Sequence, residues 1–337
     1  MPRTVDVHAH AWLPQIQSLV RYRPEYPAYA ELEELRAGRA SAGVSARRFA
    51  ENRGLLTDPD ARIAAMTAAG VDVQVVSVSP TQYHSWADPV LAWELAQATH
   101  DGIREHCAAH PERLCGLGVA PLRHPETAVA ALEHALGNGL RGVEISSHAP
   151  LPDGGTVELS DPALNPLWAR AEELGAVLFL HPWGCTLDAR LDRWYLANSV
   201  GQPVEHTVAI THLIFGGVLD RFPRLRLLIA HGGGYLPTSL GRADHAWRHR
   251  PEAAGCRELP STYPPRMWFD SLVYTPESLH ALIRAAGPDR VLLGSDYPFD
   301  MGIEDPVRRL ADAVPDPGLA AAIGGGNAAE LGLLPHF

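Results

Sequence analysis

The stretch "TVDVHAH", residues 4–10, gives the first indication of the fold. Its valines form a short apolar run that ends in His8 and His10, with one alanine between them. Successive side chains of a strand point to opposite faces, so residues two apart lie on the same side. The spacing therefore predicts a buried strand whose end presents two imidazoles in one direction.

Seven further apolar runs follow, and helix-like segments separate them. They are rich in Val, Leu and Ile with little alternation, which is typical of parallel strands covered on both faces. Eight strands alternating with helices predict an α/β fold, a (β/α)8 TIM barrel, in preference to an open sheet. A dinucleotide-binding sheet would place GxGxxG after the first strand, where this chain has HAH instead. The eight runs are 4–10, 71–80, 113–122, 140–148, 175–182, 224–234, 267–274 and 290–298.

The clearest helix signal is "DPDARIAAMTAAG", residues 58–70. Asp58 suits the N-cap, Pro59 the first helical position and Gly70 the C-terminal stop. "ADPVLAWELAQATHDGIREHCAAH" repeats this start with Asp88 and Pro89. These signals support regular alternation of strand and helix along the chain.

The segment of residues 11–57 interrupts that alternation. About sixty residues separate the first two predicted strands, far more than an ordinary barrel loop. The segment contains Pro, Tyr and Arg and is only weakly periodic. We interpret it as an insertion over the barrel mouth, between the first strand and the first helix. Residues 1–337 are then expected to form a single barrel domain.

Composition excludes several classes of function. The chain has 337 residues, 46% of them hydrophobic, and a net charge of −11. A nucleic-acid surface needs a basic stripe, so no nucleic-acid partner is expected. The sequence shows no secretory signal and no window long and apolar enough for a membrane span, so we expect a cytoplasmic protein. The four cysteines fit neither a zinc knuckle nor a CxxC motif, and reduced, packed thiols are expected.

Five ionisable side chains stand at predicted C-terminal strand ends. His8 and His10 end strand 1, His181 strand 5, His231 strand 6 and Asp296 strand 8. A barrel gathers these ends on one face, where catalytic loops lie. Three imidazoles and a carboxylate suit zinc, or manganese or another divalent metal. Either His231 or Asp296 is then left over to act as an acid or base.

Glu144 lies in predicted strand 4 between Val143 and Ile145. Alternation could turn its carboxylate into the barrel, where it would bridge a second metal ion. A hydrogen-bonded core carboxylate is the alternative, and the sequence favours it. A metal:protein ratio near two would support the second ion.

The chain resembles the amidohydrolase superfamily, and within it the branch that contains 2-amino-3-carboxymuconate-6-semialdehyde decarboxylase. The resemblance runs over nearly the whole chain. It is carried by "VDVHAH", "DPDARIAAMTAAGVDVQVVSVSP", "LFLHPWG", "AHGGGYLPTSLGRADHAWRHR", "FDSLVY" and "DRVLLGSDYPF". It implies a distorted barrel with a mononuclear zinc site.

The resemblance also implies a role for individual residues. The metal ligands would be His8, His10, His181 and Asp296, with a water molecule, and His231 would be the general base and acid. The family holds substrate carboxylates with two arginines, one of them from a neighbouring subunit. That arginine corresponds to Arg242, and Trp194 matches an aromatic residue of the pocket. A homodimer is therefore implied.

The substrate side departs from the family pattern. The second arginine precedes an "LWDP" word in the family, whereas this chain reads "ARRFAENRGLLTDP". Arg47, Arg48 or Arg53 would have to replace it, and Arg47 is taken as the candidate. After strand 2 the chain has Tyr83 and His84 in "TQYHSW", and both are expected to contact substrate.

These features favour a metal-dependent, non-oxidative decarboxylase that acts on a small aromatic or muconate-type carboxylic acid. In this interpretation His231 transfers the proton, Arg242 neutralises a carboxylate, and Asp296 binds the metal and relays a proton. The same site could instead serve a hydrolase or hydratase, because a metal-activated water can attack a carbonyl or a double bond. A binding protein with a structural metal is the third possibility, but structural sites rarely leave an ionisable group to spare.

Overall fold

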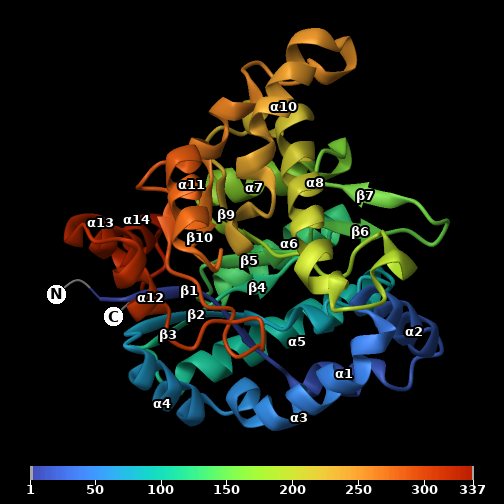
Figure 1. The fold of residues 1–337 in the computed structure, drawn as a ribbon. Helices are drawn as coiled ribbons and strands as arrows, with labels where there is room; N and C mark the ends of the chain where they lie inside the picture. Colours follow the sequence, from blue (N-terminus) through green and yellow to red (C-terminus); the bar gives the residue numbers. More distant parts are fainter. Residues whose placement is uncertain (1–2, 336–337) are drawn as a thin grey trace.

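The eight apolar runs are confirmed as strands of one barrel in the computed structural model, which describes residues 3–335 (Figure 1). The run at 113–122 forms two short strands, β3 and β4, that Leu117 separates. The strands are β1 (Val5–Ala11), β2 (Val73–Val78), β3 (Leu114–Gly116), β4 (Gly118–Val119), β5 (Gly142–Ile145), β8 (Val177–Leu180), β9 (Arg226–Ile229), β10 (Trp268–Asp270) and β11 (Val291–Leu292).

Parallel pairing runs around the barrel in chain order. One sheet has the order β1-β2-β3 and the other β11-β10-β9-β8-β5-β4. Backbone hydrogen bonds close the ring between β1 and the chain after β11: Val7 N donates to Leu293 O at 2.9 Å, and His10 N to Tyr297 O at 2.8 Å. The register of β1 against β2 shifts between Asp6 and Ala9, so the barrel is distorted beside the two histidines.

Helices cover the outside of the ring. In α4 (Pro59–Ala69) the Asp58 side chain accepts from Asp60 N, and Gly70 ends the helix with a φ of 72°, which confirms both predicted caps. In α5 (Pro89–Ala108) Asp88 accepts from Leu91 N. The other helices after β2 are α6 (Pro125–Gly137), α7 (Asn165–Leu174), α8 (Gln202–Phe215), α9 (Val218–Arg221), α10 (Leu236–His249), α11 (Pro276–Ala286), α12 (Pro306–Ala313), α13 (Pro317–Ala321) and α14 (Asn327–Leu331).

Two apolar layers hold the fold together. The larger cluster lies between strands and helices, with Trp168, Leu132 and Ile103 fully buried. A second cluster fills the barrel interior, where Val5, Phe179 and Leu228 meet side chains of the C-terminal segment. This inner layer leaves the opposite, C-terminal ends of the strands to polar groups.

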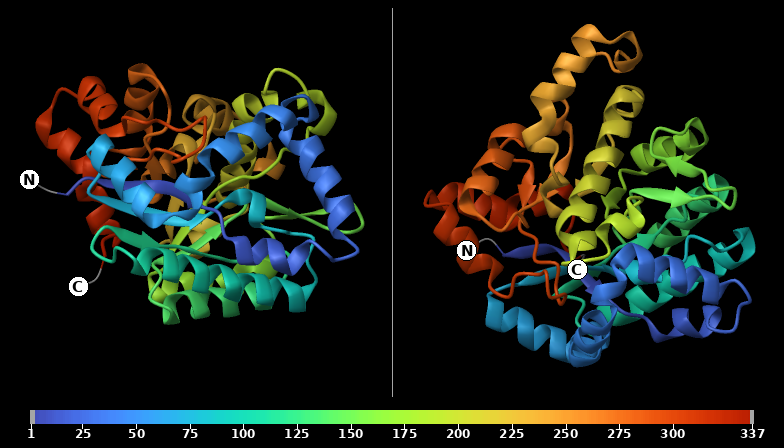
Figure 2. Two further views of the ribbon diagram at one scale, coloured as in Figure 1. Left: turned by 90° about the horizontal axis from the view of Figure 1, so that it is seen from below. Right: turned by 45° about the vertical axis from the view of Figure 1, so that its right-hand side comes forward.

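The segment between β1 and α4 is helical. It forms α1 (Pro14–Val20), α2 (Tyr26–Ala37) and α3 (Ala42–Thr57), which lie along one side of the molecule (Figure 2). A hairpin of β6 (His148–Pro150) and β7 (Thr156–Glu158) follows β5 and was not expected from the sequence. Helix α10 projects away from the barrel (Figure 1). All four cysteines are buried without a disulfide. Among the described residues, no helix combines the length and apolarity needed to cross a membrane.

Candidate metal centre

Four imidazoles from three strand ends converge on one point. His8 and His10 belong to β1, His181 follows β8, and His231 follows β9. Their ring centroids are 4.9–5.1 Å apart in each of the close pairs: His8–His10, His8–His181, His8–His231, His10–His181 and His181–His231. The barrel therefore brings together side chains that are more than 220 residues apart in sequence, as 231 minus 8 gives 223.

Asp296, in the chain after β11, completes the cluster. Its Oδ1 lies 3.4 Å from His8 Nε2 and 3.3 Å from His10 Nε2, and its Oδ2 lies 3.8 Å from His231 Nε2. One carboxylate thus faces the β1 histidines with one oxygen and His231 with the other. A φ of 59° at Asp296 turns its side chain toward the centre.

The rear nitrogen of each ring is held by a partner, so the Nε2 atoms are free to face the centre. His8 Nδ1 is 2.6 Å from Asp270 Oδ2, and His181 Nδ1 is 2.9 Å from the Pro182 carbonyl oxygen. Such rear contacts select the ring orientation that metal ligation requires. The other two are His10 Nδ1 to Val78 O at 3.1 Å and His231 Nδ1 to His206 Nε2 at 3.0 Å.

The atoms that face the centre, Nε2 of the imidazoles and Oδ1 of Asp296, suit a metal ion. His181 Nε2 and Asp296 Oδ1 are buried without a hydrogen-bond partner, and the Nε2 atoms of His8 and His10 face each other at 3.1 Å. Buried polar atoms without partners are costly, and a shared cation would satisfy all four. One ligand atom from each of His8, His181, His231 and Asp296 lies within 4.8 Å of the others. These five residues are therefore a candidate site for a divalent metal.

The charges around the centre favour a cation. Burial lowers the pKa of His8, but Asp296 and Asp270 outweigh burial and raise it to about 10. Burial raises the pKa of Asp296, yet the surrounding imidazoles hold it well below its usual range. Burial and neighbouring histidines lower the pKa of His181 well below its usual range. The site thus favours an ionised Asp296, a neutral His181 and positive charge between the two carboxylates.

Sequence reasoning missed two residues that organise the centre. Asp270 stands at the end of β10 and accepts from the backbone N–H groups of His231 and Gly232, both at 2.9 Å, besides contacting His8. His206 is fully buried in α8 behind His231. Asp270 carried a signal, because a carboxylate inside a predicted, mostly apolar barrel strand is unusual. His206 carried little signal, because it lies inside a helix, between Glu205 and Thr207, and not at the end of a predicted strand.

The glycines after His231 allow a close backbone turn. His231 has a φ of 52°, and Gly232, Gly233 and Gly234 also have positive φ. A Cβ on Gly234 would overlap the Pro203 carbonyl, and one on Gly232 would overlap the Val273 side chain. Glycine is therefore required here for both conformation and space.

A cavity of about 380 Å³ opens above the centre. His181, His231 and Asp296 form part of its wall, and α3 supplies another part through Arg48, Phe49, Asn52 and neighbouring residues. Trp183 and Tyr195 add aromatic surface. The side chain of His231 is 15% exposed, whereas those of His8 and His10 are fully buried, so a bound molecule would meet His231 and not the two histidines of β1.

The residues expected to contact substrate do not line the cavity, although the chain neighbours of two of them do. Arg47 is exposed outside the cavity, whereas Arg48, one of the two alternatives to it, lines the wall. Trp194 is 81% exposed outside the cavity, and Tyr195 lines it instead. Arg242 is exposed on the projecting helix α10 and does not reach the cavity of its own chain.

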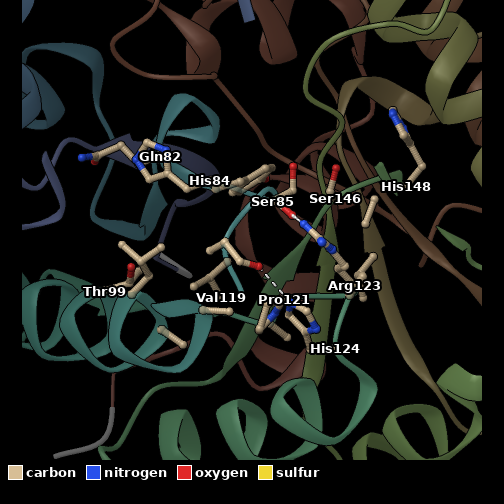
Figure 3. Close-up of a pocket in the computed structure, with 18 residues that line it drawn as sticks. Gln82, His84, Ser85, Thr99, Val119, Pro121, Arg123, His124, Ser146 and His148 are labelled. Carbon is tan, nitrogen blue, oxygen red and sulfur yellow. Dashed lines mark hydrogen bonds between the residues drawn. The ribbon is translucent and has the colours of Figure 1, made fainter. Parts of the chain in front are cut away.

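Tyr83 and His84 lie outside the metal-centre cavity, which corrects their expected placement. The Tyr83 hydroxyl donates to the carbonyl oxygen of His181 at 3.3 Å, so it supports the ligand from behind. A φ of 46° turns the buried His84 toward Tyr29 and Trp86. His84 lines a separate cavity of about 40 Å³ beside β4 (Figure 3).

Glu144 is fully buried behind His10. Its Oε1 lies 3.9 Å from His10 Nδ1, on the side away from the facing Nε2 atoms. Burial raises the pKa of Glu144 to about 8. Among the described residues, the group close enough to share one ion does not include Glu144. The structure therefore gives a second metal ion no support.

Known proteins resemble this chain in sequence over most of its length. A family model described as Amidohydrolase matches residues 5–331. 2-Amino-3-carboxymuconate-6-semialdehyde decarboxylase of Dictyostelium discoideum is 33% identical, covering 98% of this chain and 92% of that protein. Gamma-resorcylate decarboxylase of Rhizobium sp. (strain MTP-10005) is 28% identical over 73% of this chain and 78% of that protein.

Solved structures share the fold. 5-Carboxyvanillate decarboxylase from Sphingomonas paucimobilis superposes with a TM-score of 0.81 at 25% identity, covering 99% of this chain and 100% of that one. Dihydroxybenzoic acid decarboxylase from Polaromonas sp. JS666, with bound manganese and 2-nitroresorcinol, superposes with a TM-score of 0.83 at 23% identity, covering 100% and 98%.

Proposed function

The chain belongs to the amidohydrolase family, and from this premise we propose that it is a metal-dependent, non-oxidative decarboxylase of a small aromatic or muconate-type carboxylic acid. The observation that carries the proposal is His231. The centre has five ionisable groups, one more than a four-coordinate metal needs, and the side chain of His231 is the most exposed of its imidazoles. A structural metal site would have no use for such a group.

His8, His10, His181 and Asp296 would hold the metal. The donor set suits zinc, and it also accepts manganese, the metal bound in the Polaromonas structure. When bound, the metal supplies a positive charge that positions an anionic substrate and stabilises charge developing on its oxygens. Asp270 and the Val78 and Pro182 carbonyls orient the three imidazoles for this task.

His231 would supply the proton. Loss of carbon dioxide breaks the bond between the carboxyl carbon and the rest of the substrate, and the electron pair stays on the substrate carbon. The proton that His231 holds at Nε2 takes the place of the carboxyl group on that carbon. Its Nδ1 contacts His206, and Asp296 Oδ2 faces its Nε2, so the ring is held from both sides.

We also propose that the protein works as a homodimer. Arg242 is exposed on a helix that projects from the barrel and does not reach the cavity of its own chain. A neighbouring subunit could present it to a substrate carboxylate. Light scattering measures the assembly, and Arg242→Ala should raise KM about tenfold or more without monomerising the protein.

The test is release of carbon dioxide. Protein loaded with Zn²⁺ or Mn²⁺ is incubated with 2,6-dihydroxybenzoate, 5-carboxyvanillate and other small aromatic or muconate-type acids. We expect carbon dioxide from at least one acid, and chelator-treated protein should produce none. Absence of carbon dioxide throughout the panel would overturn the proposal. Labelled solvent oxygen in the organic product would instead favour a hydrolase or hydratase at the same centre.

A further inference from the structure

Arg62, in α4, is a fully buried arginine that reaches from the outer helix layer to the backbone of β1. All three nitrogens of its guanidinium donate hydrogen bonds. One terminal nitrogen donates to the carbonyl oxygen of His10 at 2.6 Å. The other two acceptors are Gln74 Oε1 at 2.7 Å and His106 Nε2 at 3.0 Å. Arg62 therefore holds the backbone of a proposed metal ligand directly.

The charge of this guanidinium is costly to bury. Burial lowers the pKa of Arg62 to about 10, so the side chain still carries its proton at neutral pH. The carboxylate that balances the charge belongs to Asp6 and lies one residue further, because Gln74 Nε2 donates to Asp6 Oδ2 at 2.8 Å. Arg62, Gln74 and Asp6 thus form one buried network. An apolar side chain of similar size would avoid the cost of burying a charge, so the guanidinium indicates a role in the groups that the network holds.

Asp6 is the other end of the network and lies in β1. It accepts from the backbone N–H of His8 at 3.2 Å and from that of Ser295 at 3.0 Å, and the Ser295 hydroxyl also donates to it. Ser295 precedes Asp296, whose own N–H donates to the carbonyl oxygen of His8 at 2.9 Å. The network therefore ends at the backbone beside two further proposed ligands, which belong to two distant segments of the chain.

The network lies where the pairing of β1 with β2 is irregular. Asp6 pairs with Gln74 and Ala9 with Val76, so three steps along β1 match two steps along β2. An extra residue in one strand interrupts the ladder of backbone hydrogen bonds, and here the interruption includes His8. The hydrogen bond between the side chains of Gln74 and Asp6 joins the two strands next to this interruption. Side chains thus fix β1 at the point where its ladder to β2 does not.

We propose that Arg62 is a positioning residue of the metal centre. It holds His10 directly, and through the network it holds the chain at His8 and Asp296. Without the guanidinium these three ligands no longer face one point, and the metal binds more weakly. If Arg62 served only to hold α4 against the barrel, its loss would lower stability alone. The inference rests on the proposed metal centre, and it concerns binding of the metal, not turnover.

The experiment measures metal binding separately from stability. Arg62→Met and Arg62→Lys are compared with the wild type for unfolding by denaturant and, by competition with a chelator, for the dissociation constant of Zn²⁺. The visible absorption of the Co²⁺-loaded protein reports the arrangement of the ligands. We expect Arg62→Met to raise the dissociation constant about tenfold to a hundredfold and to shift the Co²⁺ bands. Arg62→Lys keeps the charge without the planar set of donors and should fall between the two.

Two further variants make the result decisive. Leu132→Ala is the control, because Leu132 is fully buried in α6 and its truncation should lower the free energy of unfolding without changing Zn²⁺ affinity or the Co²⁺ spectrum. Gln74→Met cuts the link between Arg62 and Asp6 and keeps the bond to His10. It should weaken Zn²⁺ binding by a smaller factor than Arg62→Met, and it decides the question if Arg62→Met does not fold.

The outcomes separate the inference from the function it rests on. Folded variants of Arg62 and Gln74 that keep the wild-type Zn²⁺ affinity and Co²⁺ spectrum overturn the inference. An equal loss of affinity in Leu132→Ala also overturns it, because the effect is then one of general stability. If the wild type binds Zn²⁺ but releases no carbon dioxide from any acid, the proposed function fails, and the affinities still decide the role of Arg62.

Discussion

The strand-end metal centre and the cavity wall above it are built in different ways. At the centre, each imidazole is fixed by a contact to its rear nitrogen, and His8, His10, His181 and Asp296 are buried. The wall comes from α3 and from the chain that leads into α8, with side chains that are partly open to solvent. The barrel therefore holds the groups that do the chemistry, whereas recognition depends on segments attached to the barrel.

The largest expected effect comes from the group where the two regions meet. His231→Ala should lower kcat by about a thousandfold, because general acid catalysis contributes on the order of 10² to 10⁴. Metal content, measured by atomic absorption, should stay near that of the wild type if the other four residues hold the ion. Loss of the metal would show instead that His231 is a ligand, and retained activity would remove it from the reaction.

The next largest effect is expected at Asp270, the carboxylate behind the metal centre. Asp270→Asn should weaken metal affinity about tenfold to a hundredfold, because the carboxylate orients His8 and both backbone donors of the His231 turn. Affinity is measured by competition with a chelator. Asp244→Asn is the matched control, since this buried carboxylate accepts from Ser261 in another part of the fold. Equal losses in both variants would show a general effect on stability.

A third prediction concerns stability in acid. Burial raises the pKa of Glu205, but the hydrogen bond and charge of His148 outweigh burial and lower it to about 2. A lowered pKa stabilises the fold above the unfolded value of about 4.3, and this contribution is lost as the pH falls toward 2. The loss should be about 2 kcal/mol of unfolding free energy.

Denaturation curves between pH 6 and pH 2 measure this loss. Glu205→Gln should flatten the dependence in that range. Glu133→Gln, which removes an exposed partner of Arg170, should leave the curve as in the wild type. If the Glu205→Gln variant keeps the full pH dependence of the wild type, other carboxylates cause the loss of stability in acid.

The smallest expected effect distinguishes two neighbouring arginines of α3. Arg48→Gln should raise KM about threefold, because Arg48 lines the cavity but is exposed and paired with Glu51. Arg47→Gln should leave KM unchanged, since Arg47 is exposed outside the cavity. The opposite ranking would mean that α3 turns its other face to the substrate.

Prediction from sequence succeeded where the local pattern and the fold impose the same constraint. The eight apolar runs became the barrel strands, and Asp58 and Gly70 cap α4 as expected. His181, His231 and Asp296 could be placed beside His8 because a parallel barrel collects all its strand ends on one face. Trp194 and His84 lie outside the cavity, and both belong to loops, whose side-chain directions no strand or helix periodicity predicts.

The sequence by itself determined the barrel and the donor set of the centre, because strand periodicity and the side-chain type at each strand end are local properties of the chain. The tertiary structure alone decided which groups stand behind and above that centre. Asp270 reaches His8 across 262 positions, and His206 stands behind His231 only because α8 lies against the turn of His231. Such pairings depend on how distant segments pack, and no spacing within a single segment records them.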